Sequence, residues 1–181
     1  MVLAPPERCE ECGFEAASVT PVDAAGTIRA FGRRYRAPLS RFLPGEDGQA
    51  LVRRRPDATT WSALEYAAHV RDVLALWGWA LNKALTEDRP TVPAPDPGIA
   101  DRTAAEQDYR SQDPGTVVDE LAANAERVAA KIDAIGPGGW ERIVVVGDEE
   151  LSSMAIVQKV AHEGHHHLLD IGRVLRTVRG R

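Results

Sequence analysis

The sequence predicts an all-α protein, a four-helix bundle with a short β hairpin-like segment and an N-terminal C-x-x-C tail. Four segments carry apolar residues three or four positions apart, which is the spacing of one helix face. Only one run, R-I-V-V-V-G-D-E-E at 142–150, has the composition of a strand or hairpin. With 181 residues the chain has room for one such domain, predicted over 20–181, after a tail over 1–19.

The first two helices are predicted from their apolar faces and their ends. The first begins after Thr20-Pro21 and ends before Pro44-Gly45. Its apolar face consists of Ile28, Phe31, Tyr35, Leu39 and Phe42. Ser62 and Glu65 have the S-x-x-E spacing of a capping box, so the second helix is predicted to start there and to continue to about Thr86.

A proline-rich connection, T-V-P-A-P-D-P-G at 91–98, separates this helix from the second half of the chain. A short helical piece is expected over 101–110. Asp113-Pro114 then provides an N-cap followed by proline at the first helical position, which predicts a third long helix that ends at the glycines of 136–139. The fourth long helix is predicted from about Ser152, with an apolar stripe that reaches Val178.

Charge and hydropathy exclude several classes of protein. The net charge of −5 argues against a nucleic-acid partner, and we interpret the arginines at 33–36 and 53–55 as a solvated face, with contact to an anionic co-substrate as a weaker alternative. No stretch approaches the roughly 20 consecutive apolar residues of a membrane span. The N-terminus lacks the apolar run of a signal peptide, so we expect a cytoplasmic protein.

The only two cysteines, Cys9 and Cys12, form the motif C-E-E-C-G-F in the tail. In a reducing compartment such a pair more often binds metal or does redox chemistry than forms a structural disulfide. Gly13 suits a metal knuckle, but a structural zinc ion requires four ligands and the chain has no second C-x-x-C. A metal knuckle, a redox or disulfide pair, and a tail without any ligand all remain open.

The histidines are concentrated in H-E-G-H-H-H, residues 162–167, which holds four of the five. His162 and His166 are one helical turn apart, so they share a face and could bind one metal ion. The fifth, His69, borders the apolar stripe of the second helix, from which a bundle can present it to that pair. We therefore predict a metal site of His69, His162 and His166 with a position open to substrate, although a histidine beside an apolar face is often only a hydrogen-bonded boundary residue.

A zinc protease is the alternative interpretation of this motif, because H-E-x-x-H is its signature. Such enzymes need a third protein ligand further along the chain, and no glutamate or histidine follows His167. We therefore expect Glu163 to hydrogen-bond to the metal ligands without binding the metal itself, or to lie on the surface, rather than to act as a protease base.

Two motifs carry a resemblance to a known family. W-S-A-L-E-Y-A-A-H-V-R-D at 61–72 and H-E-G-H-H-H-L-L-D-I at 162–171 resemble the two signatures of the DinB-like superfamily, in the expected order. The resemblance covers roughly residues 21–178. It implies a four-helix bundle that holds one divalent metal ion through His69, His162 and His166. The C-E-E-C-G-F tail is outside the family pattern, so a second zinc ion at Cys9 and Cys12 remains a separate possibility.

The resemblance also implies a class of activity, because characterised members include mycothiol-dependent maleylpyruvate isomerase and mycothiol or bacillithiol S-transferases. We therefore expect a thiol transferase in which zinc, or alternatively nickel or iron, activates a low-molecular-weight thiol of the mycothiol type toward an electrophile. A metal-dependent hydrolase and a non-enzymatic metal-binding or redox-responsive protein are the alternatives. Tyr66, Trp77, Trp79 and Tyr109 could line a pocket, though aromatic residues at helical spacing usually belong to the core. A homodimer is also possible.

Overall fold

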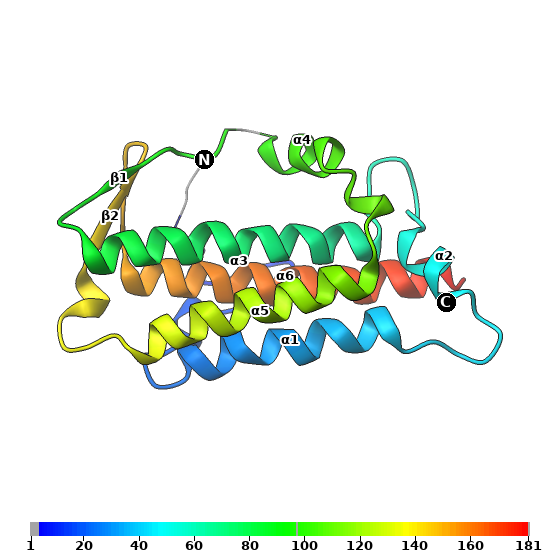
Figure 1. The fold of residues 1–181 in the computed structure, drawn as a ribbon, viewed down its shortest axis with the longest axis horizontal. Helices are drawn as coiled ribbons and strands as arrows, with labels where there is room; N and C mark the ends of the chain where they lie inside the picture. The colour runs from blue at the N-terminus through cyan, green and yellow to red at the C-terminus, as the bar shows by residue number, and fades with distance from the viewer. Residues whose placement is uncertain (1–3, 97, 181) are drawn as a thin grey trace.

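The computed structural model describes residues 4–96 and 98–180, and its long helices form the predicted bundle (Figure 1). The bundle helices are α1 (Ala24–Ser40), α3 (Ala63–Thr86), α5 (Pro114–Asp133) and α6 (Ser153–Val178). Helices α1 and α3 each pack against both α5 and α6, so α1 and α3 occupy one diagonal of the bundle. Buried apolar side chains from all four helices form a single core.

The predicted helix starts are confirmed by their capping contacts. The Ser62 hydroxyl accepts from the Glu65 backbone N–H, and the Glu65 carboxylate accepts from the Ser62 N–H, which completes the capping box of α3. Asp113 caps α5 through the Thr116 N–H. Helix α1 ends at Ser40, just before the predicted Phe42, because the backbone of Arg41 is already extended.

Short helical elements precede or connect the bundle helices. They are η1 (Ala16–Ser18), α2 (Gly48–Arg53), α4 (Ile99–Glu106), η2 (Tyr109–Ser111) and η3 (Gly139–Glu141). The helical piece expected over 101–110 is divided into α4 and η2, because Asp108 between them has a left-handed backbone with φ of 46°. Helix α2 was not predicted, since its six residues lack a recognisable apolar period.

A small sheet lies at one end of the bundle. Strands β2 (Ile143–Val146) and β3 (Glu149–Ser152) form the predicted hairpin, with Val146 opposite Glu149. The turn includes Gly147 at φ of 61°, a conformation that glycine adopts without steric cost. Strand β1 (Thr91–Val92) pairs in parallel with β2, an arrangement that local sequence patterns cannot reveal.

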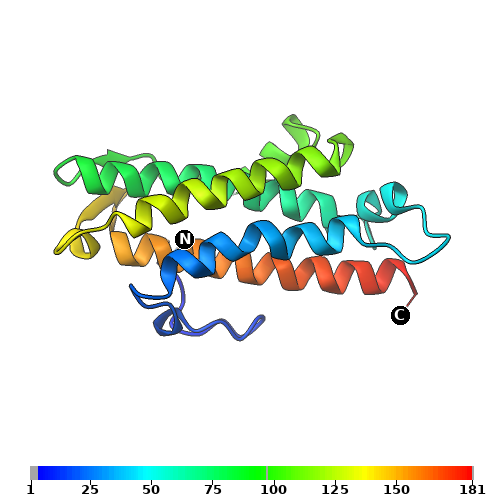
Figure 2. The same cartoon turned by 60° about the horizontal axis from the view of Figure 1, so that its bottom comes forward.

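The N-terminal segment, residues 4–19, packs along α6 (Figure 2). Phe14 and Val19 are buried in the same core as the bundle helices. The Arg173 side chain donates to the Glu11 carbonyl over 2.8 Å, and the Gln158 amide donates to the Val19 carbonyl over 3.4 Å. The predicted tail is therefore placed against the helix that carries most of the histidines.

Helices α1 and α6 approach closely at Gly164, in the middle of the histidine motif. The Tyr35 hydroxyl donates to the Gly164 carbonyl over 2.8 Å. A Cβ atom at Gly164 would lie 2.3 Å from the buried ring of Phe31. The glycine in H-E-G-H-H-H is therefore required by helix packing, and it fixes how α6 is rotated within the bundle.

Candidate metal centre

The motif 162–167 presents potential ligands on two neighbouring faces of α6. His162 and His166 are four residues apart and share one face, while Glu163 and His167 are four apart and share the next. Successive residues of an α-helix are rotated by about 100°, so the two pairs point in different directions. Each pair meets a different part of the chain.

The first cluster combines His69 of α3 with Glu163 and His167 of α6. The Glu163 Oε2 atom lies 3.4 Å from His167 Nε2 and 3.9 Å from His69 Nε2. One ligand atom from each residue lies within 4.8 Å of the others. Two imidazoles and a carboxylate at this separation are a known ligand set for divalent zinc.

The ring of His167 is fixed by a second carboxylate. His167 Nδ1 lies 3.1 Å from Asp170 Oδ2, and Asp170 also accepts from Arg173. Because Nδ1 donates to Asp170, the Nε2 atom is directed to Glu163. Burial lowers the pKa of His167, but the hydrogen bonds to Asp170 and Glu163 outweigh burial and raise the pKa to about 9. A metal ion at Nε2 would have to displace a proton.

Glu163 stays ionised over the whole physiological range. Burial raises its pKa, but the neighbouring imidazoles of His167 and His69 and the charge of Lys159 outweigh burial and hold the pKa far below its usual range. Aromatic rings cover the cluster: Trp61 packs against His69 at 5.3 Å between ring centroids, and Tyr66 stacks on His167 at 5.3 Å. The cluster therefore holds an ionised carboxylate in a partly buried, partly apolar setting.

The second cluster joins the N-terminal segment to α6. Cys9, Cys12, His162 and His166 each offer one ligand atom within 4.8 Å of the others. The Cys9 Sγ atom lies 3.6 Å from His166 Nδ1. Asp170 connects the two clusters, because its Oδ2 atom lies 3.5 Å from His166 Nε2 as well as contacting His167.

The predicted set of His69, His162 and His166 is thus divided between the two clusters. Among the described residues, no group of neighbouring ligand atoms contains all three. From the sequence, His167 was given no role and Glu163 was expected to hydrogen-bond to the ligands or to lie on the surface. In the structure, both residues lie next to His69. The available signal was that Glu163 and His167 repeat the four-residue spacing of His162 and His166. His165 belongs to neither cluster and lies against Phe14.

An apolar pocket of about 380 Å³ opens beside His69, between α3 and α4. Val73, Leu76 and Ile99 line it together with Tyr109 and Asp72. Of the aromatic residues singled out in the sequence, Tyr109 lines this pocket, Tyr66 covers the cluster, Trp77 is buried in the core and Trp79 is exposed. The pocket can accommodate the apolar part of a small molecule next to the first cluster.

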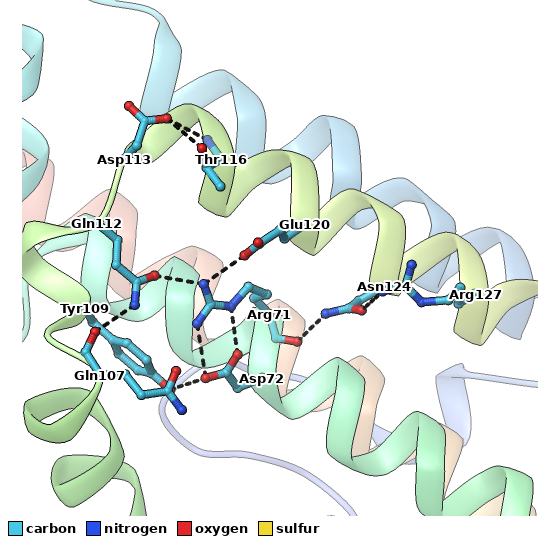
Figure 3. A network of polar contacts seen from close by, with 10 residues as sticks. All are labelled: Arg71, Asp72, Gln107, Tyr109, Gln112, Asp113, Thr116, Glu120, Asn124 and Arg127. Carbon is cyan, nitrogen blue, oxygen red and sulfur yellow. Dashed lines mark hydrogen bonds and ion pairs between the residues drawn. The ribbon is translucent and has the colours of Figure 1, made fainter.

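A polar network begins at Asp72 and Tyr109, which line this pocket, and extends from α3 to α5 (Figure 3). Arg71 donates to Asp72, Gln112 and Glu120, and the Tyr109 hydroxyl donates to Asp72. Burial and the contact with Asp72 raise the pKa of Tyr109 well above its usual range, so its hydroxyl keeps its proton. The Arg71 guanidinium is therefore paired with the carboxylates of Asp72 and Glu120.

Comparison with family models matches residues 34–171 to the DinB superfamily. The chain belongs to this superfamily. The matched region includes His69 and the whole of H-E-G-H-H-H but excludes Cys9 and Cys12. The second cluster therefore depends on a segment that lies outside the DinB match.

The solved structure of YfiT from Bacillus subtilis has the same fold. The two chains are 14% identical, with a TM-score of 0.74 over 95% of this chain and 91% of YfiT. YfiT is described as a probable metal-dependent hydrolase with an unusual four-helix bundle topology. No curated protein is significantly similar to this chain. Among its described residues, no helix of this DinB protein is both long and apolar enough to cross a membrane.

Proposed function

We propose that this DinB protein is a metal-dependent enzyme whose working centre is formed by His69, Glu163 and His167. The observation that carries the proposal is the meeting of their ligand atoms, from two helices, beside an apolar pocket. Both imidazoles are positioned by packing, and Glu163 is held ionised between them. These are properties of a ligand set prepared for a cation.

The three ligands fit a divalent metal ion that has further coordination positions free for substrate or water. Two neutral imidazoles and one carboxylate leave a net charge of +1 on such an ion, which suits catalysis better than a purely structural role. The ion would act as a Lewis acid that lowers the pKa of a thiol or of water, so that a nucleophile forms near neutral pH. Zinc is the first expectation, and nickel and iron suit the same ligands.

The surrounding residues supply positioning and exclude water. Asp170 orients the His167 ring, and the rings of Trp61 and Tyr66 shield the ligands from solvent. Leu76 and Ile99 on the pocket wall would bind the apolar body of a substrate beside His69. We infer that the substrate is a small electrophile and that the nucleophile is a low-molecular-weight thiol of the mycothiol type.

A metal-dependent hydrolase is the second candidate, and the description of YfiT favours it. The two candidates share every ligand and differ in the nucleophile. Purified protein should be loaded with zinc and incubated with a panel of thiols and electrophiles, with mass spectrometry to detect conjugates. A conjugate that forms only with protein present supports the transferase, whereas ester or amide cleavage without any conjugate would leave the hydrolase as the correct proposal.

Metal content tests the centre itself. His69→Ala removes a ligand that only the first cluster uses, so metal bound at this site should fall more than roughly tenfold. His165→Ala is the matched control, because this histidine is in the same motif but belongs to neither cluster. If His69→Ala retained the metal and activity of the parent protein, the proposed centre would be wrong. If both variants lost metal, the effect would be on folding.

A non-enzymatic protein that works through Cys9 and Cys12 is the third possibility. Cys9→Ser/Cys12→Ser should leave the His69 centre intact, because neither cysteine contacts it. Enzymatic activity that survives in this variant, with metal still bound at the His69 centre, would exclude the cysteine-based role.

A further inference from the structure

We propose that Cys9, Cys12, His162 and His166 form a second metal site, a closed zinc site that fastens the N-terminal segment to α6. The four side chains come from two parts of the chain that are about 150 residues apart in sequence, yet their ligand atoms converge. Two thiols and two imidazoles are the ligand set of many structural zinc sites. This site shares no ligand with the catalytic centre proposed above.

The separation of the ligand atoms fits a tetrahedral zinc ion. With Zn–S bonds of about 2.3 Å and Zn–N bonds of about 2.0–2.1 Å, tetrahedral geometry places a sulfur and a nitrogen about 3.6 Å apart. The Cys9 Sγ atom lies 3.6 Å from His166 Nδ1. His166 also directs its Nε2 atom to Asp170, which holds the ring in the orientation that leaves Nδ1 toward the cysteines.

The backbone of C-E-E-C-G-F is folded as a metal knuckle. The Gly13 N–H donates to the Cys9 carbonyl over 2.8 Å, and the Cys9 N–H donates to the Phe14 carbonyl over 2.8 Å. Gly13 has a left-handed backbone with φ of 71°, which lets the chain reverse directly after Cys12. A backbone hydrogen bond from Phe14 favours the thiolate form of Cys12, although burial of the thiol outweighs it and raises the pKa.

His162 provides an independent sign of a missing ligand. Its Nε2 atom is buried and has no hydrogen-bond partner among the described residues. An unsatisfied buried polar atom costs free energy, so such atoms usually have a partner in a native protein. The Phe14 ring packs against the His162 ring at 5.2 Å and closes this side to solvent. A zinc ion bound by this histidine would supply the absent partner.

Charge distinguishes the two clusters. Binding of Zn²⁺ by the second cluster releases two thiol protons to solvent, and the resulting two thiolates and two neutral imidazoles make the site electrically neutral. A neutral, four-coordinate site suits the partly buried position and has no position left for substrate. The first cluster has three ligands and keeps a positive charge, so we assign catalysis to the first cluster and attachment of the N-terminal segment to the second.

Metal counting on purified protein and variants tests this assignment. We expect about two metal ions per chain in the parent protein and about one in Cys9→Ser/Cys12→Ser, because serine hydroxyls replace the thiolate ligands poorly. His69→Ala should also fall to about one, by loss of the other ion, and His165→Ala should keep both. Equal metal content in the parent and the double cysteine variant would overturn the second site.

Cobalt(II) identifies which site remains. Added to metal-free protein, cobalt should give the intense thiolate-to-cobalt charge-transfer absorption of a tetrahedral site with cysteine ligands. His69→Ala should keep this band and the double cysteine variant should lose it. A parent protein that shows this band but binds no metal at His69, Glu163 and His167 would overturn only the proposed function. Absence of the band in the reduced parent protein, or a Cys9–Cys12 disulfide in freshly purified protein found by mass spectrometry, would overturn the zinc site.

Attachment of the segment has its own measurement. Hydrogen exchange of amides at 7–15 should become at least tenfold faster when the metal is removed by chelation, and should be equally fast in the cysteine variant with or without chelator. Unchanged protection of these amides after chelation would contradict the fastening role.

Discussion

At the scale of single residues, Asp170 contacts a histidine of each of the two clusters. It contacts His167 at 3.1 Å and His166 at 3.5 Å, and its negative charge is supported by Arg173. The pKa of Asp170 is lowered because hydrogen bonds from His167 and the nearby positive charges outweigh the effect of burial. One carboxylate thus orients an imidazole in each cluster.

Asp170→Asn should weaken metal binding without removing a ligand. The amide keeps the shape of the carboxylate but loses the charge that fixes the donating nitrogen of each ring, so metal affinity should fall about 10–100-fold. Competition with a fluorescent chelator measures this affinity. Asp133→Asn, which alters an exposed partner of Arg29 far from the motif, is the control. An unchanged affinity in Asp170→Asn would show that Asp170 does not position the ligands.

Glu65 makes the free energy of unfolding depend on pH in the acidic range. Burial raises its pKa, but hydrogen bonds from Arg55 and from Ser62 outweigh burial and lower it. The pKa of Glu65 in the folded protein is therefore below the value of about 4.3 in the unfolded chain. The contribution of Glu65 to the free energy of unfolding is fully present above the unfolded pKa and is lost as the pH falls through the folded pKa. Glu65→Gln should lower the free energy of unfolding by about 1–3 kcal/mol at pH 7.

Thermal unfolding at several pH values measures this effect. The difference between parent and Glu65→Gln should shrink as the pH is lowered below about 4, because the parent then loses the same charge. Glu87→Gln, at the C-terminal cap of the same helix, is the control, since the pair of Glu87 with Lys83 is largely exposed and should be worth less than about 1 kcal/mol. A difference that stays constant from neutral to acid pH would contradict this account.

At the scale of elements, the rotation of α6 decides which pair of ligands meets α3. The sequence contains two overlapping pairs with the same spacing, 162/166 and 163/167, and their spacing alone favours neither. Packing at Gly164 against Phe31 resolves this, because only glycine fits there. Long-range packing of this kind cannot be inferred from residue types, which is why the predicted ligand set combined residues of both faces.

Gly164→Ala should disturb the position of α6. The added Cβ would lie 2.3 Å from the Phe31 ring, which is fully buried, so we expect a loss of about 1–3 kcal/mol in the free energy of unfolding. Gly172→Ala, on the same helix, meets only the flexible Arg176 side chain at 3.7 Å and should be stabilising by about 0.5–1 kcal/mol. Chemical denaturation compares the two. Equal effects from both substitutions would show that the Phe31 contact is not restrictive.

At the scale of the whole molecule, the bundle could be predicted because capping residues in the sequence mark where its helices begin. Ser62 with Glu65, and Asp113 with Pro114, marked the starts of α3 and α5 that the structure has. The pairing of β1 with β2 depends on residues more than 50 positions apart in the sequence. The docking of C-E-E-C-G-F on α6 depends on residues about 150 positions apart. Local patterns contain no information about such distant contacts.

The whole-molecule arrangement also makes one helix serve two purposes. Helix α6 faces α3 with Glu163 and His167 and faces the N-terminal segment with His162 and His166. The cysteine-containing segment lies outside the region shared with the DinB superfamily, so this second face can be an addition to a common bundle. The homodimer suggested by the sequence stays a prediction.

The most direct test of two metal sites on one helix is an anomalous difference map from crystals of the protein as purified, measured above the absorption edge of the bound metal. We predict two peaks, one among His69, Glu163 and His167, and one among Cys9, Cys12, His162 and His166. A single peak shared by His69, His162 and His166 would contradict the division of the motif and restore the ligand set expected from the sequence alone.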